Sequence, residues 1–87
     1  MLRKEITILN FSGLHARPAA ALVKLTSKFH NTKILLQKDG LEVNAKSIMG
    51  VMMLAAEVGA VIMVRVEGED ADDALIKMVE MIETEFD

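Results

Sequence analysis

The sequence contains no cysteine, no tryptophan and no tyrosine. Without cysteine, the chain cannot form a disulfide scaffold, a thiolate zinc site or the active site of a thiol enzyme. Nothing in the composition therefore requires an oxidising compartment, and we expect a cytoplasmic protein.

Basic residues are also few, with 10 Lys and Arg against 13 Asp and Glu and a net charge of −3. Nucleic-acid binding needs clustered cations to neutralise phosphates, so we expect no nucleic-acid partner. Long apolar runs are missing too, because the longest, residues 48–56, is about half of the roughly 18 residues that span a membrane. Arg3 and Lys4 are followed by Glu5 rather than by an apolar run, so we expect neither a signal peptide nor membrane insertion.

The composition that remains is that of a folded globular protein, with 52% hydrophobic and 26% charged residues. A chain of 87 residues suits one domain, and we expect a single domain over residues 1–87. So small a domain leaves little room for a cleft that encloses a substrate.

Strand and helix patterns alternate along the chain. The predicted strands are Glu5–Leu9, Lys33–Lys38, Leu41–Asn44 and Ala60–Val66. The predicted helices are Ala16–Phe29, a short one over Ser47–Leu54, and a last one that Asp70 caps and that buries Ala71, Ala74 or Leu75, Met78, Ile82 and Phe86. Asp39-Gly40 predicts a tight hairpin between the second and third strands.

The order of these elements is βαββαβα, which predicts an α+β fold. Three amphipathic helices bury their apolar faces if all of them cover one face of a four-stranded antiparallel sheet, as in an open-faced β-sandwich. Residues 60–66 are almost continuously apolar, which predicts an interior strand.

The stretch GLHARP, residues 13–18, stands at the entrance to the first predicted helix. The first N–H groups of a helix have no partner within the helix and favour an anion. His15 supplies a nucleophilic imidazole that can accept a phosphoryl group, and Arg17 supplies a fixed cation for phosphate oxygens. Gly13 allows the tight turn that brings the imidazole there, so the stretch can hold a phosphohistidine.

Other interpretations of His15 are open on these residues alone. A single histidine before a helix is often only a cap or a surface residue. A metal site is disfavoured, because the one other histidine, His30, lies beyond the far end of the helix. A catalytic pair of Ser12 and His15 lacks an acidic partner nearby in the sequence.

The stretch NAKSIMGVMML, residues 44–54, is unusually rich in methionine. Ser47 suits the N-cap of the short helix. Methionines at helical spacing are usually core residues, but so short a helix cannot bury Ile48, Met49, Met52 and Met53 together. We therefore expect part of this set to be exposed as an adaptable docking surface.

Together, GLHARPAA (residues 13–20) and KSIMGVMML (residues 46–54) resemble the HPr family of histidine-containing phosphocarriers of the bacterial phosphoenolpyruvate-dependent phosphotransferase system. The resemblance covers essentially the whole chain. It implies that enzyme I, charged from phosphoenolpyruvate, phosphorylates His15 on Nδ1, and that the group then passes to the IIA domains of enzyme II complexes. It also implies a sheet order of 1-4-2-3.

The resemblance implies further roles for individual residues. Arg17 is the cation on the phosphate side, and Ser12 and Ala16 belong to the active-centre loop. Ser47 matches a regulatory serine that a dedicated kinase, with a phosphorylase activity, modifies. The residues that match the family's surface for partner binding are Ile48, Met49 and Met52.

These features predict a phosphocarrier in sugar uptake, without cofactor or metal, rather than an enzyme with its own turnover. One alternative keeps the chemistry but changes the output, as a nitrogen-branch or carbon-catabolite carrier that transcriptional regulators read. Another is a non-catalytic effector module in which phosphorylated Ser47 is the signal and His15 is idle.

Overall fold

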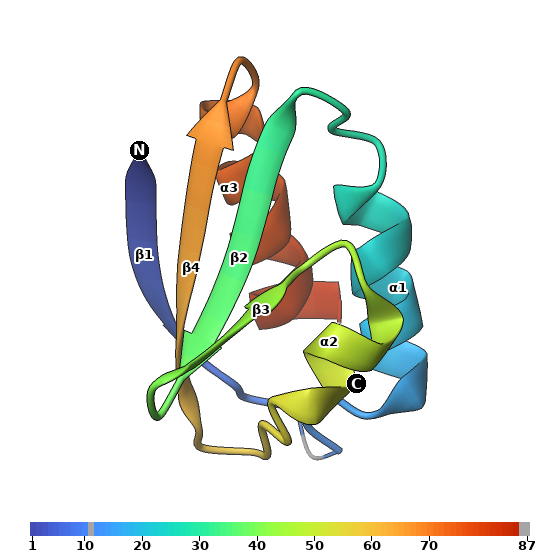
Figure 1. The fold of residues 1–87 in the computed structure, drawn as a ribbon. Coiled ribbons are helices and arrows are strands. Elements are labelled where there is room, and N and C mark those ends of the chain that lie inside the picture. The colour runs from blue at the N-terminus through green and yellow to red at the C-terminus, as the bar shows by residue number, and fades with distance from the viewer. Residues whose placement is uncertain (11, 86–87) are drawn as a thin grey trace.

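The computed structural model describes residues 1–10 and 12–85. Its elements follow the predicted order (Figure 1): β1 (Leu2–Thr7), α1 (Ala16–Thr26), β2 (Thr32–Lys38), β3 (Leu41–Asn44), α2 (Ile48–Met53), β4 (Val61–Gly68), α3 (Ala71–Glu80) and a π-helical turn, η1 (Met81–Glu85). None of the helices described is long and apolar enough to cross a membrane.

The four strands form one antiparallel sheet in the order β1-β4-β2-β3. β4 therefore lies in the interior, between β1 and β2, as its apolar sequence predicted. The two-residue loop Asp39-Gly40 joins β2 to β3, and both residues have positive φ, 50° and 85°. Such a pair matches the right-handed twist of the strands, which confirms the predicted hairpin.

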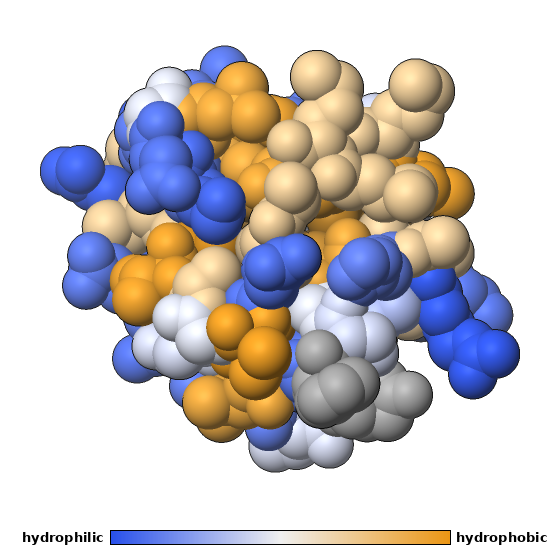
Figure 2. Space-filling view, turned by 90° about the horizontal axis from the view of Figure 1, so that it is seen from below, coloured by the Kyte–Doolittle hydropathy of each residue, from blue (hydrophilic) through white to orange (hydrophobic). Residues whose placement is uncertain are grey.

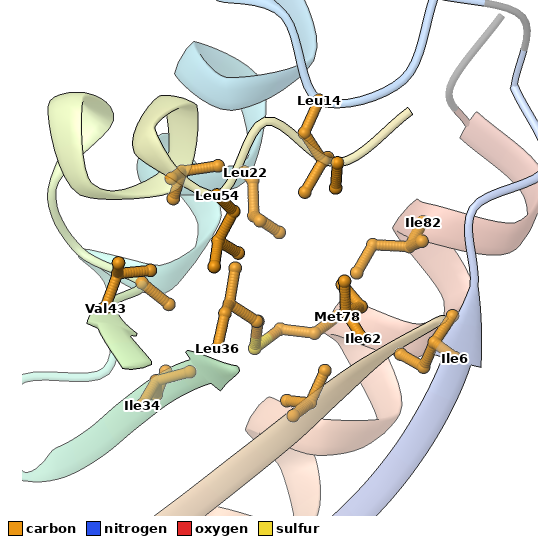
Figure 3. Close-up of a cluster of buried hydrophobic side chains, with 14 of the residues drawn as sticks. Ile6, Leu14, Leu22, Ile34, Leu36, Val43, Leu54, Ile62, Met78 and Ile82 are labelled. Carbon is orange, nitrogen blue, oxygen red and sulfur yellow. The ribbon is translucent and has the colours of Figure 1, made fainter. Parts of the chain in front are cut away.

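The helices cover one face of the sheet and leave the other face open (Figure 1). Alternate strand residues point into the layer between sheet and helices, as Ile62, Val64 and Val66 do in β4. Figure 3 shows this core, in which side chains from the sheet meet Leu22 of α1 and Met78 of α3. The predicted fold class, an open-faced α+β sandwich, is confirmed.

Several predicted boundaries were wrong. β1 begins and ends earlier than predicted and includes the charged residues Arg3 and Lys4, because its pairing with β4 runs from Leu2 to Thr7. β4 runs on to Gly68 because β2 offers pairing partners as far as Thr32.

The predicted ends of two helices also needed correction. α1 ends at Thr26, three residues before Phe29, where the Thr26 hydroxyl donates a hydrogen bond of 2.8 Å to the carbonyl of Ala45. Asp70 precedes α3, but its side chain makes no capping hydrogen bond; its backbone N–H instead donates to Thr32 Oγ1. The predicted core residue Phe86 lies outside the described residues, whereas Ala74, Met78 and Ile82 are buried as predicted.

Candidate functional site

The loop before α1 is fixed against the segment that follows α2. The backbone N–H of Leu14 donates to the carbonyl oxygen of Ala56 across 2.8 Å, and the Asn10 side-chain amide donates to the carbonyl of Gly13 across 2.9 Å. The Leu14 side chain is buried and belongs to the hydrophobic core (Figure 3). The loop is thus anchored immediately before His15.

Gly13 is required at this point for two reasons. Its φ is +65°, which a residue with a side chain adopts only with strain. In addition, a Cβ atom at this position would stand 2.4 Å from the carbonyl oxygen of Ala56 and 2.8 Å from the Cα of Glu57. The close approach of two backbones, rather than the turn alone, explains the glycine.

His15 is the N-cap residue of α1, and its side chain is exposed. Its carbonyl oxygen accepts the first hydrogen bond of the helix, from Ala19 N–H at 2.8 Å, while its imidazole makes no capping bond. Within residues 1–10 and 12–85, no hydrogen bond engages the N–H groups of Ala16 and Arg17. Pro18 has no N–H to donate. An exposed imidazole therefore stands at a helix end with two free donors, the arrangement that favours an anion.

Arg17 supplies the cation at this helix end. It is exposed, and in the described part of the chain it forms no ion pair or hydrogen bond. Together with Ser12, His15, Ala16 and Pro18 it lines an open depression of about 270 Å³. The structure thus brings together the four residues predicted around a phosphoryl group.

His15 also lines a second depression, of about 170 Å³. It is lined by residues of three segments: Leu14, His15, Met52, Ala55, Ala56 and Glu57. Among the described residues, only His15 lines both depressions. Because Met52 belongs to α2, the second depression lies between His15, the candidate phosphoryl acceptor, and α2.

Ser47 is the N-cap of α2, as predicted. Its hydroxyl oxygen accepts a hydrogen bond from Gly50 N–H across 3.0 Å, and its carbonyl accepts one from Val51 N–H. The residue before it, Lys46, donates from Nζ to the carbonyl of Phe29 across 2.6 Å. Together with the bond from Thr26, this contact fastens the start of α2 to the end of α1.

α2 buries only Val51 and exposes the rest of its apolar side chains. The exposed fractions are 44% for Ile48, 74% for Met49, 43% for Met52 and 64% for Met53. Exposure of the whole set exceeds the prediction, which expected only part of it. We call Ile48, Met49, Met52 and Met53 the α2 apolar surface. Figure 2 shows one end of the molecule, where apolar side chains form a broad band that borders hydrophilic ones.

Two residues near His15 escaped the sequence analysis. Glu57 lines the second depression, and Ala55 has a φ of +51°, the left-handed conformation that often ends a helix. Contacts between distant segments bring both residues near His15, so no local sequence pattern identifies Glu57 as its neighbour. His30 lies instead at the other end of α1, beside Asn31. Among the described residues, no group of three His, Cys, Asp or Glu is arranged to hold a metal.

Comparisons with known proteins agree with this geometry. The family model described as "PTS HPr component phosphorylation site" matches residues 2–84. Phosphocarrier protein HPr of Xylella fastidiosa is 52% identical over 86 residues, which cover 99% of this chain and 96% of the relative. The HPr-like protein Crh of Halalkalibacterium halodurans is 41% identical, with 98% of this chain and 100% of the relative covered. The crystal structure of HPr-C-His from Thermoanaerobacter tengcongensis superposes with a TM-score of 0.94 at 45% identity, and covers 99% of this chain and 96% of that one. The chain therefore belongs to the HPr family, the phosphocarriers of the phosphotransferase system.

Proposed function

We propose that His15 carries the phosphoryl group, receiving it from enzyme I and passing it to IIA domains in sugar uptake. The observation that supports this role is the exposed His15 at the N-terminus of α1, next to the N–H groups of Ala16 and Arg17 and to the Arg17 guanidinium, none of which has a partner within residues 1–10 and 12–85. This arrangement meets both needs of a carrier, which are an accessible nucleophile and an electropositive place for the transferred group.

The transfer step needs only positioning and charge from this chain. A ring nitrogen of His15, which we assign as Nδ1, attacks phosphorus in line with the leaving atom of the donor. The lone pair of the nitrogen forms the new bond, the electron pair of the broken bond stays on the donor, and the other ring nitrogen keeps its proton. Onward transfer repeats these events with His15 as the leaving group.

The helix end and Arg17 stabilise the bound phosphoryl group without trapping it. A helix N-terminus stabilises a nearby anion by about 0.3 to 1 kcal/mol, or up to about 2 kcal/mol if the site is partly buried. Arg17 adds a planar pair of donors for phosphate oxygens. Because the depression is open, both contributions stay modest, as reversible transfer requires.

Docking of both partners is assigned to the α2 apolar surface, chiefly Ile48, Met49 and Met52. Met52 lines a depression with His15, so a partner seated on α2 also reaches the imidazole. Methionine side chains are flexible and polarisable, which suits a surface that accepts several partners in turn. A donor and an acceptor that share this surface bind one after the other, and we expect this exchange in the cytoplasm.

Ser47 is proposed as a regulatory phosphorylation site. A phosphate there adds a charge of about −1.5 to −2 at the start of α2, where the helix tolerates it, but beside the apolar surface that partners need. Ser47 is partly exposed, and within the described part of the chain its hydroxyl is bonded only to Gly50 N–H, so a serine kinase can reach it. We expect weaker docking with the fold preserved.

A regulatory output is the second candidate. The relatives include proteins named HPr-like protein Crh, and a similar solved structure is that of Crh, the Bacillus subtilis catabolite repression containing protein. On this alternative, transcriptional regulators or a nitrogen-branch partner read the phosphorylation state of His15 or Ser47 instead of a sugar permease. Binding of a regulator to the Ser47-phosphorylated His15→Ala variant would favour an effector in which His15 is idle.

The test is incubation of the protein with enzyme I and labelled phosphoenolpyruvate. We expect acid-labile label on the wild type and on His30→Ala, which removes the other histidine, and none on His15→Ala. Label that persists on His15→Ala would overturn the assignment.

A further inference from the structure

Glu57 has a backbone fixed on two sides. The Gly13 backbone packs against it so closely that a Cβ on Gly13 would lie 2.8 Å from Glu57 Cα. Its carbonyl oxygen accepts a hydrogen bond from Ala60 N–H across 2.9 Å in the turn that precedes β4. The position of Glu57 next to the His15 loop is therefore a fixed feature of the fold, and only its side chain is free to move.

The Glu57 carboxylate is exposed and forms no ion pair with any cation of residues 1–10 and 12–85. It lines the 170 Å³ depression together with His15 and the apolar Met52. Arg17 lines only the other depression. His15 thus lines one depression with the cation Arg17 at the start of α1, and another with Glu57, whose negative charge no cation of the described residues pairs.

We propose that Glu57 tunes the transfer potential of His15 by placing a negative charge next to the phosphorylated imidazole. This inference rests on the proposed role of His15 as the phosphoryl carrier. The phosphoryl group brings close to two negative charges, so the carboxylate repels the phosphorylated state but hardly affects the neutral ring. The carrier then holds its group less tightly and donates it more readily.

Two residues of opposite charge, Arg17 and Glu57, therefore each line a depression with His15. Arg17 and the helix end favour arrival of the phosphoryl group, while Glu57 favours its departure. Glu57 takes part in no bond that forms or breaks, so it acts through its charge and is not a catalytic residue. Glu57 changes the equilibrium constant of phosphorylation, and this constant does not depend on how well a partner docks.

The experiment measures this equilibrium constant with catalytic enzyme I, phosphoenolpyruvate and a large excess of pyruvate. We expect Glu57→Gln to shift the equilibrium toward the phosphorylated carrier by about three- to tenfold, the effect of removing one exposed charge that repels a dianion across the depression they share. Glu57→Lys should shift it further in the same direction. In about 1 M salt, where the Debye length is about 3 Å, most of both shifts should disappear.

Glu69→Gln is the matched control. Glu69 is also exposed and also makes no ion pair in the described part of the chain, but it follows β4 whereas Glu57 precedes it. The eight residues of β4 span about 26 Å, and the two glutamates lie beyond opposite ends of this strand. Glu69→Gln removes the same charge from the protein and should leave the equilibrium unchanged.

The outcomes separate this inference from the proposed function. If the wild type takes up the phosphoryl group on His15 and both Glu57 variants share its equilibrium constant, the inference is overturned and the carrier role stands. A shift that Glu57→Gln and Glu69→Gln share, or one that persists in high salt, also overturns it. If His15 takes up no phosphoryl group, the proposed function itself is wrong.

Discussion

The backbone N–H of Leu14 and the carbonyl oxygen of Ala56 form a 2.8 Å hydrogen bond that joins the two ends of the candidate site. Leu14 directly precedes His15 at the start of α1, and Ala56 lies in the segment that follows α2. At their opposite ends the two helices are joined again, by the bond from Lys46 to Phe29. The candidate acceptor and the candidate regulatory serine thus belong to one rigidly connected pair of helices.

This close approach makes a specific prediction for Gly13. Gly13→Ala adds a Cβ that would stand 2.4 Å from the carbonyl of Ala56, and it also strains a φ of +65°. We expect a loss of roughly 3 kcal/mol or more in the free energy of unfolding, since the strain and the displaced backbone both contribute. Phosphorylation of His15 should also slow, because the loop that presents it moves. Urea unfolding and the rate of phosphoryl uptake measure the two effects.

Gly40→Ala is the control for Gly13→Ala. Gly40 has a φ of +85°, but a Cβ there would meet no atom within 4 Å. The substitution should cost only the strain of about 1 to 2 kcal/mol and leave phosphorylation unchanged. Equal losses for the two variants would show that the contact with Ala56 contributes nothing.

Removal of the cation at α1 should slow transfer and leave the fold intact. Arg17→Gln deletes a charged donor that is worth about 1.5 to 3 kcal/mol when it bonds a charged group, so we expect phosphorylation by enzyme I to slow by about ten- to a hundredfold. Arg17 makes no ion pair in the described residues, so the unfolding midpoint should hardly change. Lys24→Gln, at the other end of the same helix, serves as the control and should transfer normally.

Ser47 combines a structural and a regulatory role that two variants separate. Ser47→Ala removes the acceptor for Gly50 N–H, and we expect the free energy of unfolding to fall by about 1 kcal/mol. Ser47→Asp keeps an acceptor and should retain most of the stability, while its charge weakens docking to enzyme I and raises the KM for the carrier. Ser27→Ala changes an exposed serine at the C-cap of α1, where the backbone N–H rather than the side chain makes the capping bonds, and should alter neither. An unchanged KM for Ser47→Asp would contradict the regulatory assignment.

The α2 apolar surface is tested through its most exposed member. Met49 is 74% exposed, so Met49→Ala should leave stability within about 0.5 kcal/mol of the wild type. Loss of a side chain from a docking surface should raise the KM of enzyme I for the carrier severalfold, with little change in kcat. Ile76→Ala removes a side chain of α3 that is 63% exposed and should leave the KM alone. If both variants behave alike, the partner does not dock on α2.

The sequence predicts the elements whose signals are local. The Asp39-Gly40 turn, the apolar run of β4 and the serine cap of α2 all depend on neighbouring residues, and the structure has each of them. Boundaries set by pairing across the sheet, such as the early start of β1 at Leu2, were wrong because their cause lies in another strand.

The residues of the candidate site likewise differ in whether the local sequence predicts them. His15 and Arg17 stand in one short motif, so their proximity follows from the sequence. Glu57 lines a depression with His15 because the Gly13 and Ala56 backbones approach closely, a contact between residues about forty positions apart. No local sequence pattern identifies Glu57 as a neighbour of His15, and only the fold brings its charge into this region.

The most direct measurement of the central claim is the bonding partner of the transferred phosphorus. NMR of the protein labelled with ¹⁵N, after phosphorylation by enzyme I, should show phosphorus coupled to Nδ1 of His15. A phosphoryl group bound to Ser12, Ser47 or His30, with the His15 ring unmodified, would contradict the account.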